Sequence, residues 1–254
     1  MRLIGKIFGA LLGLCLLVYS AACVLLWKNQ RDFLYFPALA RQAEVPVLEL
    51  PRGDVRVLVS VREGPGPQAV LYLGGNAEDV SRTLPQLANE FPRAAIYALH
   101  YRGYGGSGGS PTEAMLVGDA LALFDQIRRK HPQVRVIGRS LGSGIAVQVA
   151  SLRPAQKLVL VTPYNSIAGI AAQQFPYFPT DWLLIDRYDS GKYARKVTAP
   201  TLLILAENDH VIPRASSLQL LDAFAPGVAH AVMISDVGHN DISQSADYES
   251  ALTR

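Results

Sequence analysis

The sequence predicts an α/β protein whose mostly parallel sheet is covered by helices on both faces and preceded by an apolar N-terminal helix. Three observations support this fold class. Short apolar stretches of β-strand type recur along the chain, amphipathic stretches of helix type lie between them, and a long uncharged run occupies the N-terminus. Strands without polar positions are typical of a sheet buried on both faces, and intervening helices supply the crossovers that parallel strands need.

The N-terminal run is the first element. Residues 7–27 carry no charged side chain and are rich in Leu, Val, Ala and Gly. A helix of this length, at about 1.5 Å per residue, spans the roughly 30 Å hydrocarbon core of a bilayer. Arg2 and Lys6 precede the run, and Lys28 and Arg31 follow it. The pattern indicates a helix that crosses the membrane once.

We therefore expect residues 1–28 to form a membrane anchor and residues 29–254 to form the folded body. A signal sequence is an alternative, because YSAAC offers small residues and Cys23 offers a lipidation site, although Ser20 stands where a lipoprotein signal would have a leucine-like residue. A buried core helix is a third interpretation. Anchors this close to the N-terminus usually leave that end in the cytoplasm, so we expect the body on the extracytoplasmic side.

The body is electrically balanced, with 21 basic and 21 acidic side chains after residue 28. A neutral body without a basic run argues against nucleic acid as a partner. Both cysteines, Cys15 and Cys23, lie in the apolar run, so the body cannot form a disulfide. It must be held together by a buried core.

Eight stretches of the body read as strands. VLEL and VRVLVSVRE come first, followed by AVLYLGG (69–75), AAIYALH (94–100) and VRVIG (134–138), and then by KLVLVTP, PTLLILAE and HAVMISD. Between two of them, TEAMLVGDALALFDQIRRK repeats apolar residues at three- and four-residue spacing, which predicts a helix with Thr112 as its N-cap. The body is therefore predicted to contain one eight-stranded sheet.

One serine stands between glycines where a strand meets a helix. VRVIG ends at Gly138, and Arg139, Ser140, Leu141 and Gly142 follow it. SGIAVQVASLR then continues as a helix. A strand, a tight Gly-x-Ser-x-Gly turn and a helix are typical of a nucleophile elbow. The glycines permit the sharp turn, and the helix N-terminus beneath the serine favours developing negative charge. The alternative is a flexible turn that happens to hold a serine.

A serine hydroxyl needs a base, and His239 is the best candidate among the five histidines. It follows the last strand, in DVGHND, where a loop can carry it over the elbow. We expect His131 to be solvated at a helix end and His230 to lie at a strand edge. We expect His210 to point away from its acidic neighbour, and His100 to line the mouth of the site.

A carboxylate should orient the base, and Asp209 ends the strand that precedes His239. The chain order Ser140, Asp209, His239 is the order expected around such an elbow, and all three residues fall at carboxyl ends of predicted strands, which form the functional face of a parallel sheet. Three other aspartates are rival acids: Asp186, Asp236 and Asp241.

An oxyanion hole is also expected, because a tetrahedral intermediate places negative charge on oxygen. One donor is the backbone N–H of Leu141, directly after the serine. The other is the backbone N–H of Asn76, in the loop where Gly74 and Gly75 permit a tight turn.

Seven motifs, spread over residues 29–241, point to one known group of proteins: NQRDFLYFP, GGNAED, YRGYGGSGGSP, GRSLGSG, TPYNSI, ENDHVIP and GHND. Through them the chain resembles the membrane-anchored serine hydrolases of the α/β-hydrolase superfamily, in the branch related to prolyl-oligopeptidase-type peptidases and depalmitoylating thioesterase-like enzymes. The resemblance implies the α/β-hydrolase fold and a triad on Ser140, Asp209 and His239. Two departures adjoin the expected site, since the family's histidine before GN is here Gly74 and its aspartate before YRGYG is here His100.

The function expected from these features is hydrolysis of ester or thioester bonds of small apolar acyl substrates through an acyl-enzyme. A peptidase of the same fold and a non-catalytic membrane scaffold are the alternatives. No metal or cofactor is expected, because HExxH and Cys-x-x-Cys are absent and no Walker lysine follows the glycine-rich YRGYGGSGGSP. A cap is expected at about residues 163–196. The expected pocket residues are Gly74, His100, Tyr164, Phe175, Phe178 and Trp182.

Overall fold

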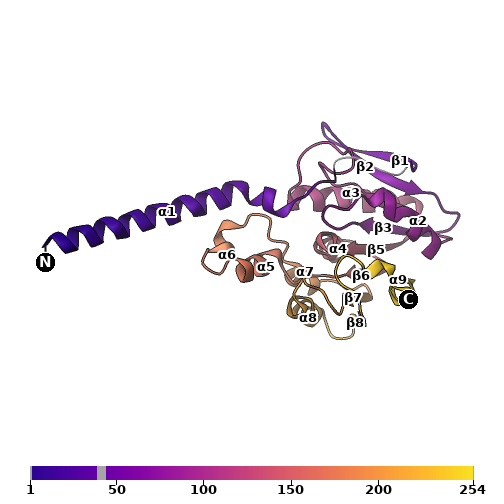
Figure 1. Cartoon of the computed structure of the whole chain (residues 1–254). Coiled ribbons are helices and arrows are strands. Elements are labelled where there is room, and N and C mark those ends of the chain that lie inside the picture. Colours follow the sequence, from indigo (N-terminus) through magenta and orange to yellow (C-terminus); the bar gives the residue numbers. More distant parts are fainter. Residues whose placement is uncertain (1, 39–43, 254) are drawn as a thin grey trace.

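The computed structural model describes residues 2–38 and 44–253. Its first element is the long helix α1 (Arg2–Leu34), which stands out from the body as a rod (Figure 1). The helix is long and apolar enough to cross a membrane. It continues past Lys28, where the anchor is predicted to end, because no glycine or proline interrupts the chain before Pro37.

The body contains one eight-stranded sheet in the order β1-β2-β4-β3-β5-β6-β7-β8. β2 pairs antiparallel with β1 and with β4, and the remaining pairs are parallel. The predicted eight-stranded, mostly parallel sheet is therefore confirmed. The strands are β1 (Val47–Arg52), β2 (Val55–Arg62), β3 (Gln68–Leu73), β4 (Ala95–Leu99), β5 (Gln133–Arg139), β6 (Lys157–Val161), β7 (Thr201–Ala206) and β8 (Ala229–Ile234).

Helices cover both faces of the sheet, and each face has its own apolar core. One core is closed by α3 (Glu113–Lys130), α4 (Leu141–Leu152), α7 (Ser190–Ala194) and α8 (Arg214–Ala223), and the other by α2 (Val80–Glu90) and α9 (Ala246–Thr253). A short 3₁₀ helix, η1 (Ile242–Gln244), precedes α9. The predicted N-cap of α3 is confirmed, since Thr112 Oγ1 accepts from the Met115 N–H at 3.2 Å.

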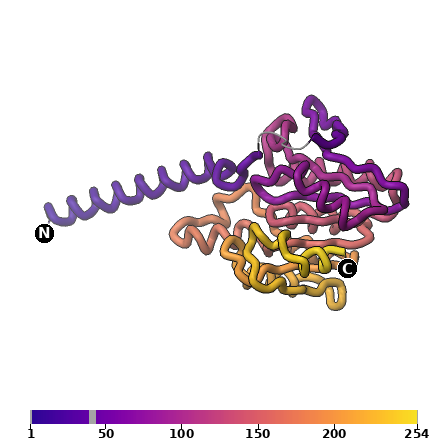
Figure 2. The backbone as a smooth tube through the Cα atoms, turned by 45° about the vertical axis from the view of Figure 1, so that its right-hand side comes forward, coloured from indigo at the N-terminus to yellow at the C-terminus, as the bar shows by residue number. Residues whose placement is uncertain are grey.

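Two further helices, α5 (Ile167–Gln174) and α6 (Thr180–Leu183), lie in the insertion between β6 and β7. We call the segment 166–185, which contains both, the cap. Figures 1 and 2 show the cap projecting from the body beside the C-terminal part of α1, and α6 is in contact with that helix. The carboxyl ends of β5, β6 and β7 lead into the same region, so the functional face of the sheet lies beneath the cap.

The turn between β5 and α4 is packed so tightly that it requires glycine. A Cβ atom at Gly142 would overlap the carbonyl oxygen of Leu73, and one at Gly138 would overlap the carbonyl oxygen of Gly142. These are backbone atoms of the neighbouring strand and of the turn itself, so they cannot move aside as a flexible side chain could.

We therefore expect Gly142→Ala to lower the free energy of unfolding by about 3 kcal/mol, the upper range for overpacking a well-packed interior. The matched control is Gly118→Ala in α3, where the nearest atom to a new Cβ would be Arg52 Nη2 at 3.7 Å. That control should gain about 0.5–1 kcal/mol from helix propensity. Urea unfolding of both variants in detergent measures the difference, and equal stabilities would contradict the packing argument.

Candidate active site

Ser140 lies at the junction of β5 and α4 with φ 48° and ψ −116°. A positive φ is strained for serine, and such strain persists only where the surroundings hold it. The Ser140 N–H donates to the carbonyl of Val161 on β6 at 2.9 Å, and the Ser140 carbonyl accepts from both the N–H and the Oγ of Ser143. The turn is thus fixed on both sides, with its serine above the N-terminus of a twelve-residue helix.

The structure brings the serine, the histidine and the aspartate predicted from the sequence into one hydrogen-bonded chain. His239 Nε2 lies 2.9 Å from Ser140 Oγ, and His239 Nδ1 lies 2.8 Å from Asp209 Oδ2. The other carboxylate oxygen of Asp209 accepts from the N–H groups of Val211 and Ile212 at 2.9 and 2.8 Å. Both oxygens are therefore occupied, and the carboxylate has one orientation available.

The environment of Asp209 keeps its carboxyl ionised. Burial acts to raise the pKa of Asp209, but the hydrogen bonds from His239 and from the backbone N–H groups outweigh burial and leave the pKa below its ordinary value. An ionised carboxylate on Nδ1 holds the imidazole with its proton on that nitrogen and leaves Nε2 free to accept the proton of Ser140.

The three rival aspartates have other partners. Asp186 is buried and accepts from the side chains of Arg31 and Tyr35 and from the backbone of Glu113. The exposed Asp236 donates its N–H to Glu207 Oε2. Asp241 accepts the N–H of Gly238 at 2.7 Å. In the part of the chain that the structure describes, the side-chain partner of His239 among the acids is Asp209.

Two of the remaining histidines differ from expectation. His131, predicted to be solvated, is buried, and its ring meets Tyr97 Oη at 3.3 Å and the carbonyl of Gly66 at 3.1 Å. His100, predicted to line the mouth of the site, is also buried, with Nε2 2.7 Å from Ser60 Oγ on β2. By contrast His230 and His210 are exposed.

The loop after β3 lies against Ser140. A Cβ atom at Gly75 would stand only 3.6 Å from Ser140 Cβ. The side chain of the next residue, Asn76, is held by hydrogen bonds to other segments: Nδ2 donates to the Leu34 carbonyl at 2.7 Å, and Oδ1 accepts from the Phe36 N–H at 2.9 Å and from Tyr104 Oη at 2.8 Å. The end of α1 therefore fixes the loop that faces the serine.

Two residues that were not singled out from the sequence brace this arrangement. Glu78 accepts from the N–H of Gly75, from Tyr72 Oη and from Thr83 Oγ1 at 2.6–2.8 Å. Arg139 Nη1 lies 3.9 Å from Glu78, while its Nη2 donates to the carbonyl of Asn240 at 3.1 Å. Arg139 thus connects the loop after β3 with the loop that carries His239. Both residues stand inside recognised motifs, but the sequence offered no signal that they pair.

A cavity of about 360 Å³ opens beside Ser140. Its wall combines the sheet face, including Asn76 and Leu141, with the end of α1 and with the cap. Among the described residues that line it, none carries a charge. Of the expected pocket residues, three line this cavity: Tyr164, Phe175 and Phe178.

The other three expected pocket residues do not line the cavity. Gly74 is buried beneath the loop, where a Cβ would overlap Val80, and its carbonyl accepts from Tyr101 Oη. His100 is turned toward β2, as described above. Trp182 is 90 % exposed on the outside of the cap. The departures at Gly74 and His100 therefore alter packing beneath the site and not the wall of the cavity.

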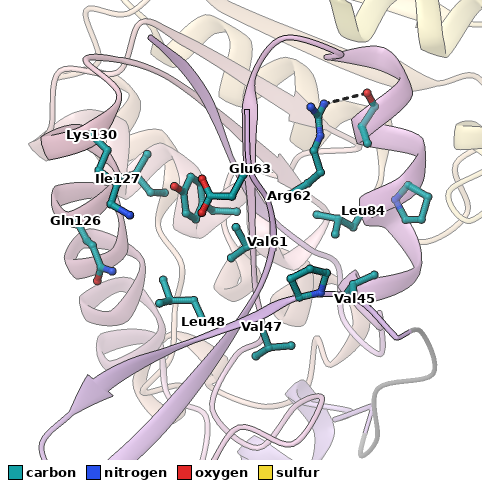
Figure 3. A pocket seen from close by; sticks show the side chains of 14 residues that line it. Val45, Val47, Leu48, Val61, Arg62, Glu63, Leu84, Gln126, Ile127 and Lys130 are labelled. Carbon is teal, nitrogen blue, oxygen red and sulfur yellow. Dashed lines mark hydrogen bonds between the residues drawn. The ribbon is translucent and has the colours of Figure 1, made fainter. Parts of the chain in front are cut away.

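A second pocket, of about 570 Å³, lies at the β1–β2 side of the sheet (Figure 3). Figure 3 shows Gln126 and Lys130 on one side of it and Leu84 on the other, with Val61 between them. Its described lining residues include neither Ser140 nor the two residues hydrogen-bonded in series with it. This pocket is therefore separate from the candidate active site.

The fold agrees with the comparison with known proteins. The family model described as alpha/beta hydrolase fold matches residues 69–184, which run from β3 through the elbow into the cap. The chain belongs to the α/β-hydrolase fold family, and the fold predicted from the sequence is confirmed. The narrower branch that the motifs resemble stays a prediction.

Individual relatives are similar over most of the chain. The uncharacterized protein Rv2307c of Mycobacterium tuberculosis is 34 % identical over 244 residues, covering 89 % of this chain and 85 % of that protein. Alpha/beta hydrolase domain-containing protein 17C of Xenopus tropicalis is 28 % identical over 239 residues, covering 91 % and 76 %.

Solved structures are similar in fold at low sequence identity. The Pyrococcus furiosus esterase Pf2001 superposes with a TM-score of 0.70 at 18 % identity, over 86 % of this chain and 96 % of that one. Est1E from Butyrivibrio proteoclasticus gives a TM-score of 0.65 at 13 % identity, over 82 % and 96 %.

Proposed function

We propose that this protein is a serine hydrolase that cleaves ester or thioester bonds of apolar acyl groups. The observation that carries the proposal is the hydrogen-bonded series Asp209–His239–Ser140, set on a strained turn beside an uncharged cavity. A serine with an adjacent base and an orienting carboxylate is the arrangement that activates a hydroxyl for acyl transfer.

The proposed reaction begins when His239 Nε2 takes the proton of Ser140 Oγ as this oxygen attacks the acyl carbon. The tetrahedral intermediate carries its negative charge on the former carbonyl oxygen, to which the N–H groups of Leu141 and Asn76 donate. His239 then returns the proton to the departing alkoxide or thiolate, which leaves an acyl group on Ser140. A water molecule, deprotonated by His239, hydrolyses this acyl-enzyme and regenerates the serine.

The assignment of Asn76 as an oxyanion donor is supported by how its loop is held. Its side chain is tied to the end of α1, and Glu78 holds the preceding N–H, so its own N–H is presented from a fixed position. Donors that need no rearrangement stabilise developing charge best. Leu141 supplies the matching N–H from the first position of α4.

The cavity favours an acyl substrate over a peptide. A peptidase that reads a charged terminus or a charged side chain needs an opposite charge in its pocket, and the described lining residues carry none. One solved structure of similar fold, Pyrococcus furiosus Pf2001, is named as an esterase, which is consistent with the same bond class. The peptidase is therefore the second candidate.

A fluorophosphonate probe tests the proposal on the full chain in detergent. We expect one adduct per chain, found by mass spectrometry on the peptide that contains Ser140. Esters, thioesters and aminoacyl amides of matched acyl length then separate the candidates, with turnover expected for the first two. Faster cleavage of the amides would favour the peptidase, and absence of both labelling and turnover would favour the scaffold.

We also propose that α1 anchors the protein in a membrane with the body on the extracytoplasmic side. The support is its length, its apolar composition and its position at the N-terminus. N-terminal sequencing of the mature protein separates the anchor from a cleaved signal, because an anchor retains residues 1–22. A membrane-impermeant thiol reagent on a cysteine introduced in α8 reports the orientation in intact cells.

A further inference from the structure

The cap packs along α1 well inside its apolar run. Tyr19 Oη donates to the carbonyl of Tyr177 at 2.8 Å, and the Tyr19 ring stacks on Phe178 with centroids 5.7 Å apart. Further along the helix, Gln30 Nε2 donates to the carbonyl of Leu183 at 3.1 Å. Figures 1 and 2 both show this part of α1 beside the cap.

The position of these contacts along α1 determines how deep the cap lies in a bilayer. The uncharged run covers residues 7–27, and contact with the cap begins at Tyr19. The eight helical steps from Tyr19 to Trp27 rise about 12 Å along the helix axis. A bilayer seated on the uncharged run therefore also surrounds the cap to about that depth.

The outer surface of the cap suits such an environment. Four large apolar side chains are exposed on it, and we call them the rim: Phe175, Tyr177, Trp182 and Ile185. Tyr177 and Trp182 are 86 % and 90 % exposed. The cap contains a single charged residue, Asp181, which pairs with Arg187 at 3.3 Å. Exposed apolar patches of this kind mark interaction surfaces, and tryptophan and tyrosine are enriched at membrane interfaces.

We propose that the rim lies in the membrane leaflet beside α1, and that the cavity at Ser140 receives its acyl chain sideways from that leaflet. The second half of this statement rests on the proposed function. The cavity wall begins within the uncharged run, since Leu26 lines it together with Phe178 of the cap. An acyl chain entering there moves between apolar surfaces as far as Ser140. The substrate class is therefore a long-chain ester or thioester that already resides in the bilayer.

The bilayer is the occupant that the observations favour for the rim. The rim is continuous with the exposed apolar surface of α1, through the Tyr19–Phe178 stack, and lipid is the environment that α1 itself requires. A second copy of the chain is the competing occupant, and the following measurement distinguishes the two.

The two tryptophans of the chain, Trp27 and Trp182, make the depth measurable. Trp27→Phe leaves Trp182 as the reporter on the rim, and Trp182→Phe leaves Trp27 as the reporter on α1. Each variant is reconstituted in phosphatidylcholine vesicles with or without bromine atoms on the acyl chains. We expect brominated lipid to quench both reporters at least twofold, and iodide in the water to quench neither strongly.

Three outcomes would overturn the proposal. Trp182 that is quenched by iodide and not by bromine lies in water. Trp182 that is quenched by neither is covered by protein, as a second copy would cover it. If brominated lipid does not quench the fluorescence of Trp27, α1 itself does not lie in the bilayer.

Activity tests the sideways entry with a matched pair of variants. Trp182→Asp places a charge on the rim, whereas Leu152→Asp places one at the far end of α4 from Ser140, on a side chain that is 51 % exposed. We expect Trp182→Asp to lose at least tenfold in hydrolysis of a long-chain ester in vesicles, with unchanged hydrolysis of a soluble short-chain ester. Equal vesicle rates for both variants would overturn sideways entry. Failure of fluorophosphonate labelling would instead remove the proposed function and leave the bromine result standing.

Discussion

Replacing Ser140 by alanine is expected to lower kcat by about 10⁶-fold, the size of effect that removal of a nucleophile has in a serine hydrolase. The loss follows because no acyl-enzyme can form, while the cavity and the oxyanion donors stay in place. Fold and thermal midpoint should change little, since alanine occupies the same turn with one atom fewer. The measurement is background-corrected turnover of a soluble ester by the full chain in detergent.

The control for this substitution is Ser151→Ala on the same helix. Ser151 Oγ donates to the carbonyl of Gln148 at 2.8 Å and lies at the other end of α4. We expect its kcat to stay within about twofold of the wild type, because a bond of this kind contributes only about 1 kcal/mol to stability. Activity that survives in Ser140→Ala would show that another residue is the nucleophile.

Replacing Asp209 by asparagine is expected to lower kcat by about 10⁴-fold with little change in the fold. The carboxylate accepts from His239 Nδ1, and an amide in its place can instead donate to that nitrogen and stabilise the wrong tautomer. Nε2 then carries the proton and cannot accept one from Ser140. Turnover of the soluble ester measures the loss, and circular dichroism confirms that the variant is folded.

Asp236→Asn is the matched control for the acid, because Asp236 is exposed and lies three residues before His239. We expect near wild-type turnover from it, and a large loss there would contradict the assignment of Asp209.

The stability of the fold, measured over a pH series, adds an independent readout. The lowered pKa of Asp209 means that its carboxylate stabilises the fold fully above the unfolded pKa of about 3.9. This contribution is lost as the pH falls through the lower folded pKa, and Asp209→Asn should lack that loss.

The sheet could be predicted from the sequence because its strands are short apolar runs bounded by glycine, proline and polar residues. That pattern fixed the number of strands and their carboxyl ends. Since the carboxyl ends of parallel strands meet at one edge, Ser140, Asp209 and His239 could be expected to meet before any distance was known. The hydrogen bonds that join them agree with this expectation.

The expectations that were wrong concern the directions in which side chains point. His100 ends β4 next to the site in sequence, but its ring turns toward Ser60 on the antiparallel strand β2, a neighbour that periodicity cannot reveal. The sequence predicts Trp182 to be a pocket residue because it is large and apolar, yet it faces outward. When one side of a cap faces a membrane, an apolar residue of the cap can face either the cavity or the lipid. The amino-acid composition does not distinguish these two orientations.

The contribution of α1 to the cavity could not be predicted from the sequence either. Leu26 and Gln30 line a wall completed by residues about 150 positions later in the chain. A charge boundary at Lys28 suggested that anchor and body are separate units, whereas the helix crosses that boundary without a break. Contacts between positions so far apart in the chain produce no local sequence pattern from which they could be predicted.

The long separation between α1 and its partners also imposes an order on biosynthesis. Gln30 bonds to Leu183 and Ile185, and Arg31 bonds to Asp186, so these contacts join positions 153 to 155 residues apart. At about 5–20 residues per second, the ribosome needs roughly 8–30 s to make the later partner after the earlier one. The first helix to leave the ribosome is therefore among the last to complete its contacts. During that interval Gln30 has the carbonyl of Trp27 within α1 as a partner, whereas its bonds to Leu183 and Ile185 and the bond of Arg31 to Asp186 form only once that segment has been made.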